Sequence, residues 1–356
     1  MMSLEGRIIN KRIKTLANQQ LMVEEITKKQ DWDAVLNEIG NYDFYHTYDY
    51  HMLSKRADEK SVLLVYREHP TIIAIPLIIR SIEGTNFNDV TSVYGYAGPI
   101  SKNMSTDFDN TKFNKDLNIY FQENKIISVF SRLNPYIENQ ELILSNIGEC
   151  HNTSEVVAID LTKDLESQRR EYQRRIKSQI NKARRLCTIT KAQSKEDIDQ
   201  FIDIYYENMG RVNAADSYYF ERTYFYDFIA SDNFKSDVLL AISNETNEVI
   251  AGALFVKTNN IVQYHLSGTK SSHLDIMPIK MLIDEMRILA TEEGFEYLNL
   301  GGGYAGVVDS LLRFKLSFSK NLKPFRVWKH IVHTDAYNEL ALANSNQRKD
   351  YFPAYR

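Results

Sequence analysis

The segment YHLSGTKSSHLDIMPIKMLIDEMRILATEEGFEYLNLGGG, residues 264–303, holds most of the pattern that decides the fold. Its first residues complete a β-rich run that ends at Gly268, and a polar loop follows. A helix is predicted over 278–293, because proline is favoured at the first helical position and apolar residues then recur at helical spacing. An apolar run at 297–300 leads into Gly301-Gly302-Gly303. The segment therefore predicts a strand, loop, helix, strand and glycine loop.

Two similar hairpin units indicate that this pattern occurs twice. VLLAISNETNEVIAGALFVK at 238–257 and VLLVYREHPTIIAIPLIIR at 62–80 each contain two β-rich runs separated by polar turn residues. The earlier unit is also followed by a strand at 90–94, the small-residue stretch 95–99, and a helix and strand over 110–133. Helical spacing also precedes each hairpin, at 32–39, 45–57, 195–209 and 218–230. The shared order of elements predicts an internal duplication.

The composition restricts the class of protein. The 356 residues have a net charge of −4 and are 43% hydrophobic, which excludes global disorder and favours two domains. The two cysteines, Cys150 and Cys187, are too few for a disulfide framework or a thiolate metal cluster. Apolar runs such as 72–79 are too short to span a membrane, and the charged N-terminal segment does not resemble a signal peptide. We therefore expect a soluble, cytoplasmic protein.

Residues 165–186 carry a strong excess of Lys and Arg over Glu, and neither proline nor glycine interrupts them. One helix with an apolar stripe is predicted here. Arg174, Arg175 and Lys182 on its basic side would bind a polyanion: an RNA backbone, a substrate pyrophosphate or an anionic membrane surface. The alternative is a solvated connector whose cations pair with acidic neighbours. Sequence-specific DNA binding is not expected, because helix-turn-helix and zinc signatures are absent from the sequence.

Other motifs restrict the kinds of binding site that the sequence predicts. The glycine runs match neither GxGxxG nor GxxxxGK[ST], so Rossmann and P-loop sites are not predicted. Three glycines at 301–303 favour close approach to a ligand, and a tight turn is the alternative. The histidines form neither HExxH nor HxH, so no metal site is expected. His265 lies on a predicted strand, on the same side as Gln263, where a structural histidine is favoured over a general base.

A lysine in an apolar setting is the strongest catalytic candidate. In DSLLRFKLSF, residues 309–318, a helix would place Lys315 beside Leu311, Leu312 and Phe318. Such a lysine either extends outward to solvent or stabilises an oxyanion that develops at an acyl carbon. The sequence has no GxSxG elbow and no local signature around its cysteines, so a covalent acyl-enzyme is not predicted.

In the order and spacing of these motifs, the chain resembles the Fem-type aminoacyl transferases, which are built from two tandem acetyltransferase-like (GNAT) domains. The matching features are the strand, Pro-led helix and glycine loop of 264–303, and the Phe-Lys-x-x-Phe motif within 309–318. The basic run Arg174-Arg175-Ile176 and an aromatic helix at 46–55 also match, and the resemblance covers 42–333. It implies a mixed α/β fold with two tandem GNAT-like domains, each a largely antiparallel sheet flanked by helices.

The resemblance also implies domain limits and residue roles. The expected parts are a polar segment 1–30, a first GNAT-like domain 31–162, a basic connecting helix 163–187, a catalytic GNAT-like domain 188–335 and a tail 336–356. Lys315 would stabilise the tetrahedral transition state. The donor would contact Phe314, Gly268, Gly302 and Gly303. The acceptor would contact Lys55, Arg211, Tyr264 and His265.

The implied activity is transfer of an aminoacyl or acyl group to an amine of a cell-wall or cell-envelope precursor, lipid- or UDP-linked, without a covalent enzyme intermediate. The co-substrate would be aminoacyl-tRNA or acyl-CoA, and no bound cofactor is expected. Amine attack on an activated ester needs positioning and oxyanion stabilisation more than a protein nucleophile. Contact with the inner face of the membrane is compatible with this role.

Two departures from the family pattern leave alternatives open. The motif ends as Phe318-Ser319 rather than Phe-Gly, and a long antiparallel helical arm after the basic segment is missing from the sequence. One alternative is an acyl-CoA-dependent N-acyltransferase of surface-polysaccharide biosynthesis. Another is a non-catalytic module that binds RNA or a membrane surface on a degenerate transferase fold.

Overall fold

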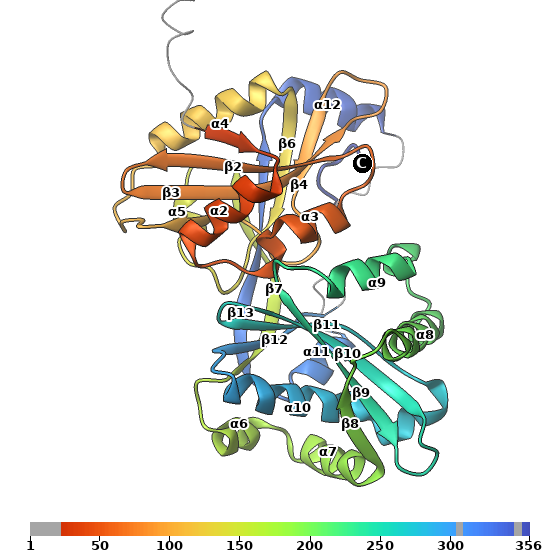
Figure 1. The fold of residues 1–356 in the computed structure, drawn as a ribbon. Helices are drawn as coiled ribbons and strands as arrows, with labels where there is room; N and C mark the ends of the chain where they lie inside the picture. The colour runs from red at the N-terminus through yellow and green to blue at the C-terminus, as the bar shows by residue number, and fades with distance from the viewer. Residues whose placement is uncertain (1–22, 304–308, 345–350) are drawn as a thin grey trace, which may run out of the picture.

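The computed structural model describes residues 23–303, 309–344 and 351–356, which form two lobes joined through one β-sheet (Figure 1). The fold is mixed α/β, with a largely antiparallel sheet flanked by helices, as the sequence predicts. Most of the predicted N-terminal segment, residues 1–22, lies outside the described residues. Within the part of the chain that is described, no helix is both long and apolar enough to cross a membrane.

The elements of the first lobe precede and include β7. In chain order they are β1 (Val23–Ile26), α2 (Lys29–Ile39), η1 (Phe44–His46), α3 (Tyr48–Ser54), β2 (Lys60–Glu68), β3 (Thr71–Ser81), β4 (Asn88–Thr91), β5 (Ile100–Lys102), α4 (Thr111–Glu123), β6 (Ile126–Arg132), α5 (Gln140–Ile143) and β7 (Glu149–Asp160). The predicted hairpin forms β2 and β3, which pair in antiparallel register from Lys60↔Ile79 to Glu68↔Thr71.

The second lobe repeats much of this order. Its elements are α6 (Leu165–Glu171), α7 (Arg174–Leu186), β8 (Cys187–Lys191), α8 (Lys195–Arg211), η2 (Asp216–Tyr218), α9 (Arg222–Ile229), β9 (Lys235–Ser243), β10 (Val249–Thr258), β11 (Ile261–Thr269), η3 (Ser271–Ile276), α10 (Pro278–Glu292), β12 (Tyr297–Gly301), α11 (Ser310–Lys315), β13 (Asn321–Ile331) and α12 (Thr334–Ala343). Although α12 comes last, it packs against β6 in the first lobe (Figure 1).

The strand order confirms the predicted duplication. Across the sheet it is β1-β2-β3-β4-β6-β13-β7-β12-β11-β10-β9-β8, and β5 pairs with β3 off this path. Read inward from each edge, the first lobe follows β1-β2-β3-β4-β6 and the second follows β8-β9-β10-β11-β12. The pairs β4–β6 and β11–β12 are both parallel, with a helix between their strands in the chain.

The two central strands are exchanged between the lobes. The second half of β13 pairs with β6 in the first lobe, through Val327↔Arg132 to Ile331↔Ser128. The end of β7 pairs with β12 in the second lobe, through Gly301↔Val157 to Tyr297↔Asp160. β7 and β13 also pair with each other along most of their length. The predicted residue ranges of the two domains stay a prediction, because the sheet runs without a break through both lobes.

The single basic helix predicted over 165–186 is wrong, because the segment forms two helices, α6 and α7. The break falls at Tyr172 and Gln173, whose backbone ψ angles of 137° and 144° are extended. Tyr172 is buried, and its ring packs against Phe318 at 5.3 Å. The Gln173 amide donates to the Ser317 carbonyl at 3.0 Å. Tertiary contacts therefore interrupt a segment that has no local helix breaker.

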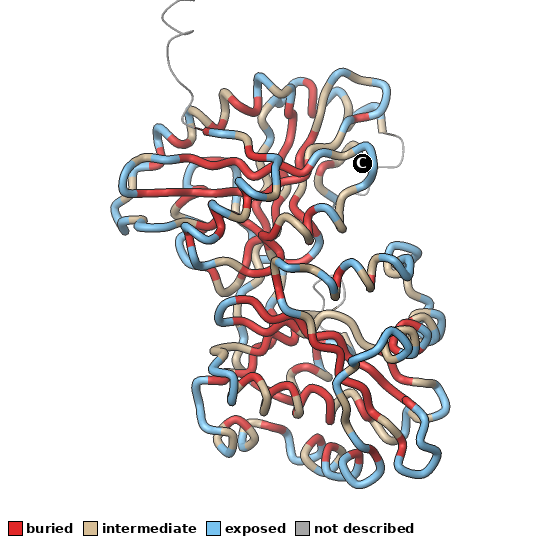
Figure 2. Tube along the Cα trace, in the orientation of Figure 1, coloured by how far each residue is buried: buried red, intermediate tan, exposed pale blue. Residues whose placement is uncertain are grey.

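Buried residues follow the sheet through both lobes, as the red parts of the tube in Figure 2 show. In the second lobe, α7 and α10 cover one face with residues that include Ile176, Ile180 and Met281. A separate cluster at the junction contains aromatic residues of both lobes, including Phe44 and Phe228. Burial of this much aromatic surface stabilises the lobes against each other.

Candidate active site

Lys315 is held at the end of the short helix α11, beneath the end of β12. The Asp309 side chain caps this helix by accepting from the Leu312 amide at 2.8 Å. Lys315 is only 8% exposed, and its Nζ donates to the Gly302 carbonyl at 2.8 Å. Burial lowers the pKa of Lys315 to about 8, although Asp309 acts in the opposite direction. The ammonium group is therefore partly dehydrated and sits directly against the glycine loop.

The glycines of the loop leave room for groups of this chain. Gly301 has φ +76°, and a Cβ there would lie 3.1 Å from Lys315 Nζ and 3.4 Å from the Tyr96 hydroxyl. A Cβ on Gly302 would lie 2.9 Å from the Glu155 carbonyl oxygen. The close approach that these glycines permit is thus between the lysine, a tyrosine and strand β7.

Tyr96 is a site residue that the sequence analysis did not identify. It comes from the first lobe, from the small-residue stretch 95–99, and reaches the glycine loop of the second. Its ring packs edge-on against Tyr45 at 5.5 Å and Phe325 at 5.2 Å. Burial raises the pKa of Tyr96 to about 12, so its hydroxyl keeps its proton near neutral pH. The only sequence signal was the glycine run that contains it.

A buried polar network connects the same loop to the first lobe. Asp43 Oδ2 accepts from Gln263 Nε2 at 2.6 Å and from Asn134 Nδ2 at 3.0 Å. Gln263 in turn accepts from Asn299 Nδ2 at 2.7 Å, and the side-chain oxygen of Asn299 accepts from the Gly301 amide at 3.0 Å. Burial is the main cause that raises the pKa of Asp43 to about 6. These residues are far apart in sequence, so no local pattern could have linked them.

Phe314 lies beside basic groups of α7 and α10. Its ring packs against Phe318 at 5.5 Å, and Lys280 Nζ lies 5.9 Å from the ring centroid. Burial and the nearby Arg175 guanidinium both lower the pKa of Lys280. The Phe314-Lys315 pair therefore connects the glycine loop, through Lys315, with Lys280 of α10, through Phe314.

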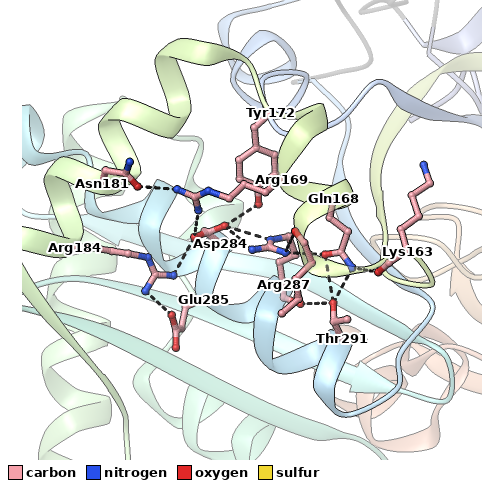
Figure 3. A network of polar contacts seen from close by, with 11 residues as sticks. Lys163, Gln168, Arg169, Tyr172, Asn181, Arg184, Asp284, Glu285, Arg287 and Thr291 are labelled. Atoms are coloured by element: carbon pink, nitrogen blue, oxygen red, sulfur yellow. Dashed lines mark hydrogen bonds and ion pairs between the residues drawn. The ribbon is translucent and has the colours of Figure 1, made fainter.

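Part of the basic segment has a structural role. Asp284 of α10 is fully buried and pairs with Arg169 and Arg184 at 3.0 Å, and with Arg287 of its own helix at 3.0 Å (Figure 3). The Tyr172 hydroxyl donates to the same carboxylate at 3.2 Å. These arginines hold α6 and α7 onto α10, which agrees with the connector alternative for this portion of the segment.

The three residues predicted to bind a polyanion are placed differently from one another. Arg174 and Arg175 are exposed at the start of α7 and form no ion pair with any residue that the structure describes. Lys182 Nζ donates a hydrogen bond to the Asp275 carbonyl at 3.2 Å and lies 3.6 Å from a carboxylate oxygen of the same residue. Exposed pairs of this kind are weak, so all three cations stay candidates for polyanion binding.

The residues predicted to bind the acceptor come from different elements of the two lobes. Lys55 follows α3 in the first lobe, whereas Arg211 ends α8 in the second. Tyr264 packs in the cluster under α10, 5.6 Å from Phe255. His265 faces the junction cluster and stacks on Phe228 at 4.9 Å. Tyr264 and His265 therefore face opposite sides of the sheet, as neighbouring residues of a strand do.

Two of the predicted site residues have a packing explanation. A Cβ on Gly268 would lie 2.7 Å from the Ile204 carbonyl, so this glycine allows α8 to lie directly on β11. The His265 Nε2 atom is buried without a hydrogen-bond partner among the described residues, and burial lowers the pKa of this histidine to about 4. Gly303 lies in the glycine loop and is half-buried. Their roles in ligand binding stay predictions.

Comparison with known proteins places this geometry in a known fold. Residues 168–315 match the family described as "Acetyltransferase (GNAT) domain". The structure is similar to that of FemX, with a TM-score of 0.67 and 12% identity over 89% of this chain and 99% of that chain. The chain therefore has the tandem GNAT fold of the Fem type, as predicted. No curated protein sequence matches it.

Two further structures share the fold. The C-terminal domain of a putative lysylphosphatidylglycerol synthetase from Agrobacterium fabrum has a TM-score of 0.55 and 13% identity, over 89% of this chain and 96% of that chain. A conserved protein of unknown function from Bacteroides thetaiotaomicron has a TM-score of 0.57 and 13% identity, over 88% of this chain and all of that chain (100%). These two similarities concern the fold, and the family match supports an acyltransferase.

Proposed function

We propose that the protein transfers an aminoacyl or acyl group from an activated ester or thioester to an amine of a cell-envelope precursor. The observation that carries this proposal is the buried ammonium group of Lys315 against the Gly302 carbonyl, where the two lobes meet. A lysine ammonium has three donors, and the Gly302 carbonyl uses one of them. A donor remains to stabilise negative charge on a substrate oxygen.

The proposed reaction is direct aminolysis. The acceptor amine attacks the donor carbonyl carbon and forms a carbon–nitrogen bond, and the carbonyl oxygen becomes an oxyanion that Lys315 stabilises. The carbon–oxygen or carbon–sulfur bond of the donor then breaks. The proton lost by the amine goes to the leaving alcohol or thiol, so no covalent bond to the protein forms. Oxyanion stabilisation in a partly dehydrated site is commonly a large contribution to catalysis.

The donor is proposed to approach over Phe314 and the glycine loop. The exposed Arg174 and Arg175, with Lys280 near the Phe314 ring, would contact donor phosphates, which both RNA and coenzyme A carry. Aminoacyl-tRNA is our first choice of donor, because FemX is the most similar of the three structures compared above. Acyl-CoA is the second, because the family match is to an acetyltransferase domain.

The acceptor is proposed to bind at the junction of the lobes, where Lys55 and Arg211 would contact its anionic groups. A lipid- or UDP-linked precursor supplies such groups. One of the similar structures belongs to a putative lysylphosphatidylglycerol synthetase, and we extend to this chain the idea of an acceptor at a membrane surface. A cytoplasmic protein in peripheral contact with the membrane would meet either acceptor.

Substitution of Lys315 tests the proposal. Lys315→Met keeps the length of the side chain but removes the charge, so turnover should fall by roughly 10²–10³-fold. Donor binding, measured as thermal stabilisation by acetyl-CoA or aminoacyl-tRNA, should persist. Lys320→Met, which removes an exposed lysine after the same helix, is the matched control and should leave turnover unchanged. Full turnover in Lys315→Met would refute the proposed role and favour a non-catalytic module.

A further inference from the structure

Arg132 is an unusual arginine at the end of β6, where the first lobe meets the second. It is half-buried, and its backbone amide donates to the Ser92 hydroxyl at 3.0 Å. Its guanidinium carbon lies 4.9 Å from the centroid of the Phe130 ring and 5.8 Å from that of the Tyr94 ring. The charged group is therefore framed by aromatic faces rather than by polar side chains.

What sets Arg132 apart is the lack of a carboxylate partner among the residues that the structure describes. Five arginines of the described ranges 23–303, 309–344 and 351–356 are buried or half-buried. Four of them pair with acids: Arg80 with Asp89, Arg169 and Arg287 with Asp284, and Arg326 with Glu141. Arg132 alone forms no ion pair with any described residue. Cation–π contacts offset part of the cost of burial but satisfy none of the five N–H donors.

The charged residues near Arg132 do not neutralise its positive charge either. Asp89 is the acid that pairs with the neighbouring Arg80, and its second oxygen accepts from Arg356 at 2.8 Å. Burial and the positive charge of Arg80 both lower the pKa of Arg132, and the groups acting in the opposite direction are the hydroxyls of Tyr94, Tyr351 and Tyr50. A half-buried cation without a counter-ion is destabilising, so its presence calls for an explanation.

The surroundings of Arg132 place it beside the proposed acceptor site. Tyr94 is 62% exposed, and its ring centroid lies 6.4 Å from that of Tyr218, which belongs to the second lobe. The Tyr94 carbonyl accepts from the hydroxyl of Tyr50 in α3, the helix that ends just before Lys55. Arg132 therefore lies near α3, which ends just before Lys55, and near η2, which follows Arg211 in the chain.

We propose that Arg132 binds a carboxylate or phosphate group of the acceptor, between the rings of Phe130 and Tyr94. A guanidinium group presents two parallel N–H donors along one edge, which fits two oxygens of either group, while its faces stay on the rings. The bound oxyanion supplies the counter-charge that no described residue provides. Assigning this anion to the acceptor rests on the proposed function, whereas binding of the anion does not.

The test separates anion binding from turnover. Thermal unfolding and calorimetric titration of the full chain would use sodium acetate, inorganic phosphate or inorganic pyrophosphate, each against chloride at equal ionic strength. Arg132→Met should raise the melting temperature of the anion-free protein, because it removes an unpaired charge while keeping an apolar side chain on the rings. It should weaken binding of the preferred anion by about tenfold or more. A preference for acetate or for the phosphates identifies the group.

Two further variants keep the test decisive. Arg132→Lys retains the charge but loses the paired donors, so it should fold like the wild type and bind the anion more weakly. Arg326→Met removes a half-buried arginine that does have a partner, Glu141 at 3.2 Å, and should retain the response to anions. Equal anion affinity in Arg132→Met and wild type, or no response of the wild type to any of the three anions, overturns the proposal. Loss of turnover in Lys315→Met with anion binding intact would show that the two proposals stand separately.

Discussion

The loop after β6 in the first lobe and the loop after β12 in the second occupy corresponding places in the repeated topology, but they are filled differently. In the first lobe, the Asn134 amide donates to Gln140 Oε1 at 2.9 Å, and Gln140 Nε2 donates to the Ala97 carbonyl at 3.4 Å. A Cβ on Gly98 would lie 3.0 Å from the Gln140 side chain, so its amide group fills the space. In the second lobe, glycines and the Lys315 ammonium occupy this place.

The same position in the repeated fold therefore has a structural role after β6 and a proposed catalytic role after β12. The Asn134 side chain donates to Asp43 and to the Tyr96 carbonyl, and the Gln140 side chain bonds to the backbone of Asn134 and Ala97, so both side chains have structural partners. Lys315 has spare donors and a perturbed pKa, which are properties of reactive sites. The first lobe contributes to this site through Tyr96 and Asp43 rather than through a site of its own.

Substitution of Asp284, which holds α6 and α7 onto α10, should produce the largest effect. The first lobe has no equivalent of these paired helices among its described residues. Asp284→Asn would leave Arg287, which is 2% exposed, and Arg169 without a counter-charge among the described residues. Arg184 would keep Glu285 at 2.8 Å. Loss of one partner from a buried ion pair costs about 3–5 kcal/mol, so the free energy of unfolding should fall by that amount. Urea unfolding measures it. Asp275→Asn, at an exposed pair, is the control and should change stability by less than about 1 kcal/mol.

The glycine loop offers a test of intermediate size. Gly302→Ala would place a Cβ 2.9 Å from the Glu155 carbonyl of β7, a strand held by neighbours on both sides. We expect a loss of about 1–3 kcal/mol of stability together with reduced turnover, because the Gly302 carbonyl also positions Lys315. Gly210→Ala in α8 meets no heavy atom closer than 3.8 Å and should stabilise the protein by about 0.5–1 kcal/mol. Equal effects of the two substitutions would mean that the loop has no special role.

The smallest effect should be a dependence of turnover on pH, which arises from the ionisation of Lys315 in the second lobe. Lys315 has a lowered pKa of about 8, and its charged form is the one that stabilises an oxyanion. The charged fraction falls as the pH rises through 8, so turnover should fall with it, by about tenfold per pH unit above that value. Lys315→Arg stays charged throughout, and the ratio of wild-type to variant turnover isolates this ionisation from that of the acceptor amine. A ratio that is flat between pH 7 and 10 would contradict the assignment.

The sequence predicts the outer parts of the sheet well and its centre poorly. Alternating apolar runs and turn residues identified the hairpins β2–β3 and β9–β10, and a Pro-led apolar pattern identified α10. The central strands β7 and β13 were missed. One begins with the polar run ECHNTSE and the other contains Pro324, so neither shows a strand pattern. Their pairing depends on contacts between distant parts of the chain.

The candidate site shows the same division. Lys315 and Phe314 could be found because one short motif contains both. Tyr96, Asp43 and Arg132 could not, because their significance depends on what the other lobe, or a neighbouring strand, places around them. A tyrosine in a glycine run and an arginine in a strand have no distinguishing local pattern. Their roles appear only with the three-dimensional neighbours.

The crossing of β7 and β13 has a consequence for how the chain reaches its native state during synthesis. The first lobe needs β13 beside β6, but residues 321–331 leave the ribosome only after the whole second half has been made. Until β13 has been synthesised, the edge of β6 in the N-terminal part stays unpaired, and an unpaired strand edge promotes aggregation. Such long-range pairing slows folding. Either half expressed alone would form a sheet that lacks one of its strands. The two halves therefore have to fold together and to be kept together in one chain.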